Sequence, residues 1–283
     1  MNRIQRDSLR VPGARLAYEI HGSGPLLLMI SGGSGNSGAF TGIANLLADQ
    51  YTVVLYDRRG SGKSPLDDSQ ADRSIERHSD DALALLRALT SEPAYVFGSS
   101  AGGLVGLDLV TRYPEHVRLL VAHEPTVPGV LPAFDASQEH HVQTYRREGA
   151  LAALSEMTTA NGGTDDEWEP GVELPPFDMQ AATTSAELLF TYTIPAILRY
   201  RLDLPVLTAV ANRVVLAGGH IGRGRQALVY QCTVALAERL GTSVVEFPGN
   251  HTGCISRPHA FAHRLREVLH MEPERAISSP GQS

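Results

Sequence analysis

The residues with the clearest chemical potential lie at 98–102, Gly-Ser-Ser-Ala-Gly, which match the pattern G-x-S-x-G. They follow an apolar run at 94–97 and precede an apolar-rich segment at 103–113 that stops before a proline. This arrangement predicts a strand, a tight turn and a helix, with Ser100 at the apex of the turn. Flanking glycines let strand and helix approach closely, and the apical serine is held strained with its hydroxyl exposed. We therefore predict that Ser100 is a nucleophile.

A serine hydroxyl needs a base that takes its proton, and the base needs an acid that orients it. The expected place for the base is a loop after the last strand of the sheet. The apolar run at 244–247 is followed by the loop Pro-Gly-Asn-His-Thr-Gly at 248–253, which meets this requirement. His251 is therefore the predicted base.

The elements that must position these residues follow from the hydrophobic pattern. Two runs around Pro12-Gly13 predict a hairpin, and further short apolar runs predict buried strands. Segments with apolar residues at helical spacing alternate with them. The predicted strands are 6–11, 14–20, 26–30, 52–56, 94–97, 118–122, 214–217 and 244–247, and the predicted helices include 40–48, 74–89, 103–113, 228–240 and 261–269. Such alternation predicts an α/β fold, with a mostly parallel central sheet flanked by helices.

The alternation lapses in the middle of the chain. Residues 126–205 are rich in proline and have helical patches near 140–157 and 185–200, so we predict a helical cap or lid insertion over the catalytic edge. The core is then 1–125 together with 206–271, and the Ser-, Pro- and Gly-rich residues 272–283 are expected to be a disordered tail. Four aromatic residues of the cap either line a substrate pocket or only pack the cap: Trp168, Phe190, Tyr192 and Tyr200.

Composition narrows the class of protein. The chain has 283 residues, 42% of them hydrophobic, and a formal charge of −7, so no basic footprint for nucleic acid is present. The 2 cysteines are too few for a disulfide framework. The first ten residues lack the apolar core of a signal peptide, and no apolar run approaches the ~20 residues that span a bilayer. We expect a cytoplasmic protein that acts on a small molecule without a cofactor, a metal or a membrane.

Over roughly residues 15–270 the chain resembles the α/β-hydrolase superfamily. The matching pieces are Ile-Ser-Gly-Gly-Ser-Gly at 30–35, Tyr-Asp-Arg-Arg-Gly-Ser-Gly-Lys-Ser at 56–64, the serine turn, and Phe-Pro-Gly-Asn-His at 247–251. The first piece is similar to the His-Gly-Gly-Pro-Gly loop of the proline iminopeptidase and esterase branches, with serines in place of the His and the Pro. The resemblance implies an oxyanion hole made by the backbone N–H groups of Gly33, Ser34 and Ala101.

The acid departs from the pattern of the superfamily. An Asp usually follows the strand that is here 214–217, but this chain has Gly-Gly-His at 218–220, and His220 occupies the usual acid position. Some members place the acid at the end of the preceding strand, where this chain has Glu124. Active-site residues of open α/β sheets gather at that edge, so Glu124 is the predicted acid. The alternatives are a Ser–His dyad or an acid from the cap, and His220 is a candidate pocket residue.

Two other motifs are set aside. Gly-Ser-Gly-Lys-Ser at 60–64 resembles the end of a phosphate-binding loop, but Asp57 stands where that motif needs glycine. His259 and His263 have zinc-ligand spacing, but they belong to the polar face of a helix.

The sequence therefore predicts a serine hydrolase that cleaves an ester, thioester, amide or lactone of a small apolar substrate through an acyl-enzyme on Ser100. The alternatives on the same scaffold are a cofactor-free C–C hydrolase, a biosynthetic cyclase, or a non-catalytic ligand receptor.

Overall fold

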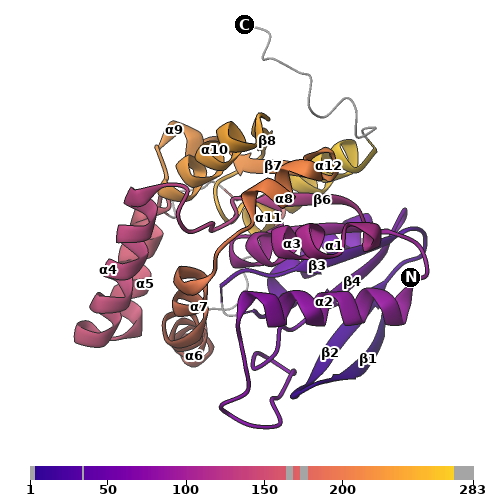
Figure 1. Cartoon of the computed structure of the whole chain (residues 1–283), viewed down its shortest axis with the longest axis horizontal. Helices are drawn as coiled ribbons and strands as arrows, with labels where there is room; N and C mark the ends of the chain where they lie inside the picture. Colours follow the sequence, from indigo (N-terminus) through magenta and orange to yellow (C-terminus); the bar gives the residue numbers. More distant parts are fainter. Residues whose placement is uncertain (1–3, 34, 164–167, 173–177, 271–283) are drawn as a thin grey trace, which may run out of the picture.

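A mostly parallel sheet forms the centre of the computed structural model, which describes residues 4–33, 35–163, 168–172 and 178–270 (Figure 1). Within these residues the sheet has 8 strands in the order β1-β2-β4-β3-β5-β6-β7-β8. Pairing is antiparallel between β1 and β2 and between β2 and β4, and parallel in the rest of the sheet. The strands are β1 (Gln5–Val11), β2 (Ala14–His21), β3 (Leu26–Ile30), β4 (Thr52–Tyr56), β5 (Ala94–Ser99), β6 (Val117–His123), β7 (Val214–Gly219) and β8 (Val245–Phe247).

Helices cover both faces of the sheet, because alternate residues of each central strand point to opposite sides. In β3, Leu27 and Met29 pack with helices α1, α11 and α12, whereas Leu28 and Ile30 pack with α2, α3, α8 and α10. These helices are α1 (Thr41–Leu47), α2 (Ile75–Leu89), α3 (Ala101–Arg112), α8 (Leu204–Ala209), α10 (Leu228–Leu240), α11 (Gly253–Ser256) and α12 (Pro258–His270). A short helix, α9 (His220–Gly224), follows β7. The predicted α/β architecture is confirmed.

Most predicted elements are present with small shifts at their ends. The predicted helix 74–89 begins at Ile75, because the Ser74 hydroxyl accepts a hydrogen bond from the Arg77 N–H and caps it. The helix after the serine turn begins at Ala101, two residues earlier than the predicted 103. The predicted patch 140–157 is two helices, because Gly149 has a φ of +91° and breaks the chain direction between them. The predicted tail 272–283 lies outside the described residues.

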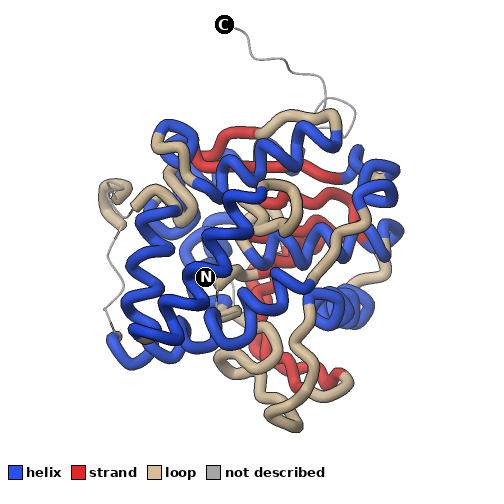
Figure 2. Tube along the Cα trace, turned by 60° about the vertical axis from the view of Figure 1, so that its left-hand side comes forward, coloured by secondary structure: helices blue, strands red, loops and turns tan. Residues whose placement is uncertain are grey.

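Between β6 and β7 the chain leaves the sheet and forms a group of helices, which we call the helical insertion. It comprises α4 (Pro132–Glu148), α5 (Ala150–Ala160), α6 (Met179–Leu188), the π-helical turn Leu189–Thr193 and α7 (Ile194–Arg199). The helices stand to one side of the sheet (Figures 1 and 2) and share a small apolar core of their own, which includes Val142, Ala153 and Phe190.

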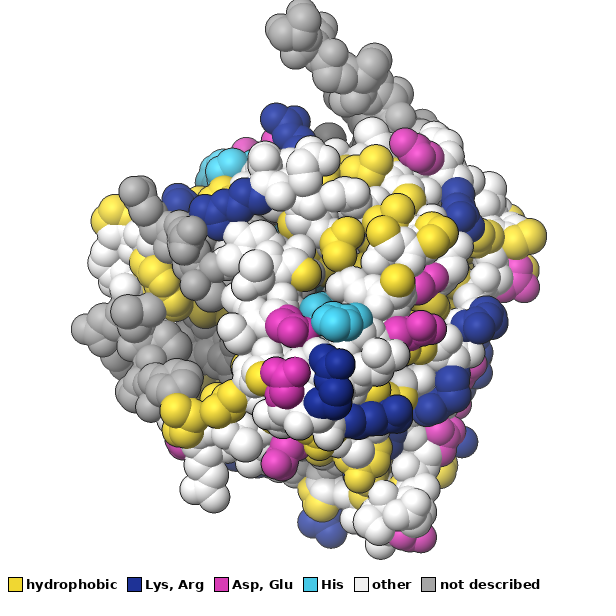
Figure 3. Space-filling view, turned by 90° about the vertical axis from the view of Figure 1, so that its left-hand side faces the viewer, with side chains coloured by type: hydrophobic (Ala, Val, Ile, Leu, Met, Phe, Trp, Pro, Cys, Tyr) yellow, Lys and Arg dark blue, Asp and Glu magenta, His cyan; other side chains and the backbone are white. Residues whose placement is uncertain are grey.

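The outer face of the helical insertion mixes charged, polar and apolar side chains. Figure 3 shows acidic, basic and histidine side chains interspersed on this side of the molecule. On α4 and α5, His140 Nε2 lies 3.5 Å from the Glu156 carboxylate, with both side chains solvent-exposed. Three large apolar side chains of the insertion, Leu151, Met179 and Tyr192, are also exposed, while others are buried in the insertion's own core.

Candidate active site

The turn between β5 and α3 holds Ser100 in a strained conformation. Its φ is 56° and its ψ is −124°, a region that residues with a Cβ rarely adopt. The two flanking glycines are required by close backbone contacts: a Cβ on Gly98 would lie 2.4 Å from the Gly102 carbonyl oxygen, and one on Gly102 would lie 2.0 Å from the Ile30 carbonyl oxygen. The two glycines of the G-x-S-x-G pattern thus permit close backbone contacts both within the turn and with β3.

His251 and Glu124 are joined by a short hydrogen bond. The distance from His251 Nδ1 to Glu124 Oε2 is 2.6 Å, and the Glu124 side chain is fully buried. The second carboxylate oxygen, Oε1, accepts the Gly219 N–H at 2.9 Å. Glu124 directly follows β6 and has a positive φ of 44°, so a second strained residue stands at the same sheet edge as Ser100.

The same edge links Glu124 to the serine turn. The Ser100 N–H donates to the His123 carbonyl oxygen at 2.9 Å, one residue before Glu124. Among the described residues, Glu124 is the carboxylate that is hydrogen-bonded to His251, and no carboxylate of the helical insertion takes that place. The structure therefore brings together the three residues predicted from the sequence.

The environment of Glu124 favours its ionised form. Burial by itself raises the pKa of this carboxyl group, but the hydrogen bond from His251, the nearby charges of His251 and His123, and the Gly219 N–H together outweigh burial. The net result is a pKa below the ordinary value. A carboxylate that stays ionised can orient His251 with a proton on Nδ1, which leaves Nε2 free to accept a proton.

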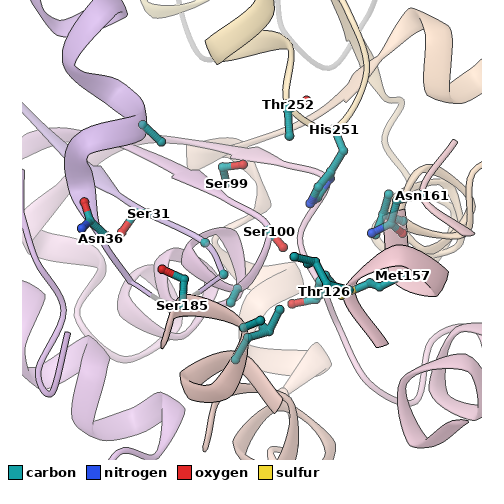
Figure 4. Close-up of a pocket in the computed structure, with 18 of the residues that line it drawn as sticks. Ser31, Asn36, Ser99, Ser100, Thr126, Met157, Asn161, Ser185, His251 and Thr252 are labelled. Carbon is teal, nitrogen blue, oxygen red and sulfur yellow. The ribbon is translucent and has the colours of Figure 1, made fainter. Parts of the chain in front are cut away.

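Ser100 and His251 face each other across one cavity. Figure 4 shows the His251 imidazole directed toward the Ser100 hydroxyl, with Ser99, Thr126 and Met157 around them. Both residues line a cavity of about 470 Å³. An imidazole aimed at a serine hydroxyl is the arrangement that activates a nucleophile.

The loop after β3 approaches the serine turn closely. A Cβ on Gly32 would lie 2.7 Å from the Ser100 Cβ, so only glycine permits this approach. Gly33 has a φ of +51° and lines the cavity, as does Ala101, the first residue of α3. The N–H of a first helical residue has no intrahelical acceptor and is available to an anion. Two of the three predicted oxyanion-hole donors thus border the cavity, and Ser34 lies outside the described residues.

The cavity is lined mainly by apolar side chains and carries no Asp, Glu, Lys or Arg among its described lining residues. The helical insertion supplies most of the apolar wall: Leu154, Met157, Ala182, Ala186, Leu189, Ile194 and Ile197. Besides His251, the polar side chains are hydroxyls and amides, namely Ser31, Asn36, Ser99, Ser100, Thr126, Gln138, Asn161, Ser185 and Thr252. Among the described lining residues, His251 carries the one basic side chain.

The four cap aromatics with two predicted alternatives, pocket lining or cap packing, are all absent from the described lining of this cavity. The ring of Phe190 stacks on Tyr145 at 5.5 Å inside the insertion's own core, and Tyr192 is 38% exposed beneath the Arg73 guanidinium. Tyr200 is buried and donates to Asp108 Oδ1 at 2.7 Å, which anchors the end of α7 to α3.

Two further candidates lie elsewhere. Trp168 is half-buried and is absent from the lining, and His220 accepts the Gly249 N–H at 3.2 Å on its Nδ1, outside the cavity. The large rings of the insertion pack between helices or bond to the core, and the insertion's share of the cavity wall is mainly aliphatic and small residues.

Sequence reasoning missed the lining residues Gln138, Thr126 and Leu154. For Gln138 a sequence signal exists, because it lies four residues from both Phe134 and Val142 and so shares a helix face with them. In the structure Gln138 is only 5% exposed. An amide on an otherwise apolar helix face indicates a polar contact inside the fold. No comparable signal marks Leu154 or Thr126.

No metal site is found: within the described residues no group of three His, Cys, Asp or Glu side chains could hold an ion. In the same part of the chain, no helix has the length and apolar character needed to cross a membrane.

Comparison with known proteins agrees with this geometry. Residues 25–180 match the family model of the alpha/beta hydrolase fold. The chain is 38% identical to "Uncharacterized hydrolase YraK" of Bacillus subtilis over 278 residues, covering 95% of this chain and 97% of that protein. The chain therefore belongs to the α/β-hydrolase family, and it is an enzyme of the hydrolase class.

Solved structures of low sequence identity share the fold. A hydrolase from Pseudomonas aeruginosa PA01 superposes with a TM-score of 0.66 at 20% identity, covering 94% of this chain and 98% of that chain. A bacterial membrane phospholipase A superposes with a TM-score of 0.72 at 21% identity, covering 96% and 87%. At these identities the likeness concerns the fold alone.

Proposed function

We propose that this protein is a serine hydrolase that cleaves an ester or a related acyl bond of an uncharged, largely apolar molecule. The observation that carries the proposal is the His251–Glu124 hydrogen bond of 2.6 Å beside the strained Ser100 turn. Ser100 and His251 line the same cavity. A buried acid, an oriented imidazole and a serine at a strand–helix turn together form the constellation of nucleophilic acyl transfer.

In the first half of the reaction, Ser100 Oγ attacks the carbonyl carbon while His251 Nε2 takes the hydroxyl proton. The carbonyl π pair becomes an oxyanion, and His251 becomes an imidazolium that the Glu124 carboxylate stabilises. The intermediate then collapses, the bond to the leaving group breaks, and the leaving oxygen, nitrogen or sulfur takes the proton from Nε2. An acyl-enzyme on Ser100 remains.

In the second half, a water molecule gives a proton to His251 Nε2 and attacks the acyl carbon. Collapse of the second tetrahedral intermediate returns that proton to Ser100 Oγ and releases the carboxylic acid. The N–H groups of Gly33 and Ala101 stabilise both oxyanions, and one such donor contributes about 3 kcal/mol to the barrier reduction.

The substrate class follows from the cavity wall. A charged group would enter a space without a counter-ion among the described lining residues, which is unfavourable. An acyl or leaving group rich in C–H bonds is stabilised by the aliphatic wall of the insertion. We therefore infer an uncharged substrate, and the helical insertion acts as the cap that encloses it.

A fluorophosphonate probe tests the proposal, because it labels only an activated serine. We expect covalent labelling of the wild type at Ser100 and loss of labelling in Ser100→Ala and His251→Ala. Ser99→Ala is the matched control, since Ser99 is adjacent and also lines the cavity; it should be labelled like the wild type. A folded wild-type protein that resists the probe would refute the serine mechanism and favour a ligand receptor. A panel of p-nitrophenyl esters of varied acyl length, run with a lactone and a thioester, would then define the substrate.

A further inference from the structure

A buried cation lies under the loop that follows β3. Arg58, the second residue after β4, has a side chain only 2% exposed. Its neighbour Arg59 forms an ion pair with the buried Asp81 at 2.6 Å, but among the described residues Arg58 has no carboxylate partner. A buried guanidinium without a counter-ion is unfavourable for stability, so its position calls for another explanation.

Arg58 binds the oxyanion loop from two directions. Its Nη2 donates to the Gly33 carbonyl oxygen at 2.8 Å, and its backbone N–H donates to the Gly35 carbonyl oxygen at 2.9 Å. A Cβ on Gly35 would lie 3.0 Å from the Arg58 Cβ and Nε, so loop and side chain are in close contact.

These bonds extend to the Gly33 N–H, a predicted donor of the oxyanion hole. The Gly35 N–H donates to the Gly32 carbonyl oxygen at 2.9 Å. That carbonyl and the Gly33 N–H belong to one planar trans peptide and point in opposite directions. The backbone N–H of Arg58 thus fixes the direction of the Gly33 N–H through Gly35 and Gly32, while the Arg58 guanidinium holds Gly33 from its other side, through the Gly33 carbonyl oxygen.

The buried charges match the charges of the proposed reaction. Glu124 lies beside His251, which becomes positive, and Arg58 lies beneath the loop that faces the oxyanion, which becomes negative. Burial lowers the pKa of Arg58 to about 10, so the guanidinium still stays charged at neutral pH. A fixed charge in a dry site acts strongly on charge that develops in a transition state.

We propose that Arg58 is a positioning residue of the oxyanion hole, which holds Gly33 and Gly35 in their working conformation and favours negative charge on the oxyanion. This inference rests on the serine hydrolase function proposed above. It concerns a side chain that touches the loop and not the substrate, since Arg58 is absent from the cavity lining.

Steady-state kinetics with p-nitrophenyl butyrate and inhibition by butylboronic acid, which forms a tetrahedral anion on an active serine, test the inference. Arg58→Met removes the charge and keeps a side chain of similar length. We expect kcat to fall ~10- to 100-fold, KM to stay within about twofold, and boronate inhibition to weaken in parallel with kcat. Arg58→Lys keeps the charge and loses the fork, so its loss should be smaller.

Arg213→Met is the matched control, because the Arg213 guanidinium also donates to a backbone carbonyl, that of Val117 at 2.7 Å, at the far end of the sheet. It should keep kcat and boronate inhibition. If folded Arg58→Met keeps kcat within about twofold, or loses kcat while boronate affinity is unchanged, the inference is wrong. If Arg58→Met does not fold, Arg58→Lys decides by the same two readouts, and unchanged values overturn the inference. If the wild type is labelled by the fluorophosphonate, the proposed function stands and only the role of Arg58 fails. If it is not labelled, the proposed function itself fails.

Discussion

Replacement of Glu124 by glutamine changes the charge of the acid and keeps its shape. The Gly219 N–H, which now donates to Oε1 at 2.9 Å, requires an acceptor at that position and so holds the oxygen of the new amide there. The amide NH₂ then faces His251 Nδ1, where the carboxylate oxygen now stands at 2.6 Å. An NH₂ donor makes Nδ1 an acceptor, so the imidazole proton moves to Nε2. In that tautomer His251 cannot take the proton of Ser100.

The magnitude follows from the lost attraction to the imidazolium. Two unit charges roughly 4 Å apart attract by about 4 kcal/mol at an effective dielectric constant of about 20. At about 1.4 kcal/mol per factor of ten, this corresponds to a ~1,000-fold fall in kcat, and the wrong tautomer adds to it. KM should change little, because Glu124 is absent from the cavity lining.

The assay is p-nitrophenyl ester hydrolysis at neutral pH, with thermal melting to show that the variant is folded. Glu115→Gln is the control for loss of one carboxylate, because Glu115 is an exposed residue far from β6's carboxyl end. A folded Glu124→Gln protein with kcat within about tenfold of the wild type would refute the assignment of Glu124 as the acid and leave a Ser–His dyad.

Three further predictions concern stability and specificity. Burial lowers the pKa of His123 from 6.5 to about 4, so between these pH values the unfolded chain binds a proton that the folded chain does not. The free energy of unfolding should therefore fall by about 3 kcal/mol as the pH drops from 6.5 to 4. In urea denaturation His123→Phe should lose less stability over this range; the same pH dependence in variant and wild type would contradict the prediction. Tyr200→Phe should lower stability by ~1–3 kcal/mol through the lost bond to Asp108 and leave KM unchanged; a large rise in KM would instead place Tyr200 at the substrate. Ala186→Phe should reduce kcat/KM for long acyl esters much more than for acetate, since Ala186 lines the cavity; an equal reduction for both would argue against an acyl site there.

The serine turn was predictable because its sequence pattern is local, although the contact of Gly102 with Ile30 is tertiary. The two glycines at 98 and 102 are required by backbone contacts within the turn and with the neighbouring β3, and Ser100 takes the one position left to a nucleophile. The alternation of short strands and amphipathic helices likewise predicts the sheet and its layers, since each period reflects which face of the segment is buried. His251 followed from its place after the last strand.

The partner of His251 needed more than local pattern. The sequence places Glu124 at the end of a strand, but only the paired strands show that this end lies next to β7 and that the Gly219 N–H holds one carboxylate oxygen. The bond at 2.6 Å between Glu124 and His251 agrees with the predicted pairing, while its catalytic role stays a prediction.

The sequence by itself thus determined the fold class and the edge of the sheet where chemistry is expected, because backbone sterics and hydrophobic period act over a few neighbouring residues. Which side chains form the cavity was decided only by the tertiary structure. Phe190 and Tyr200 turn away from it and Gln138 and Leu154 turn toward it, because packing between helices distant in the chain sets the orientation of each helix.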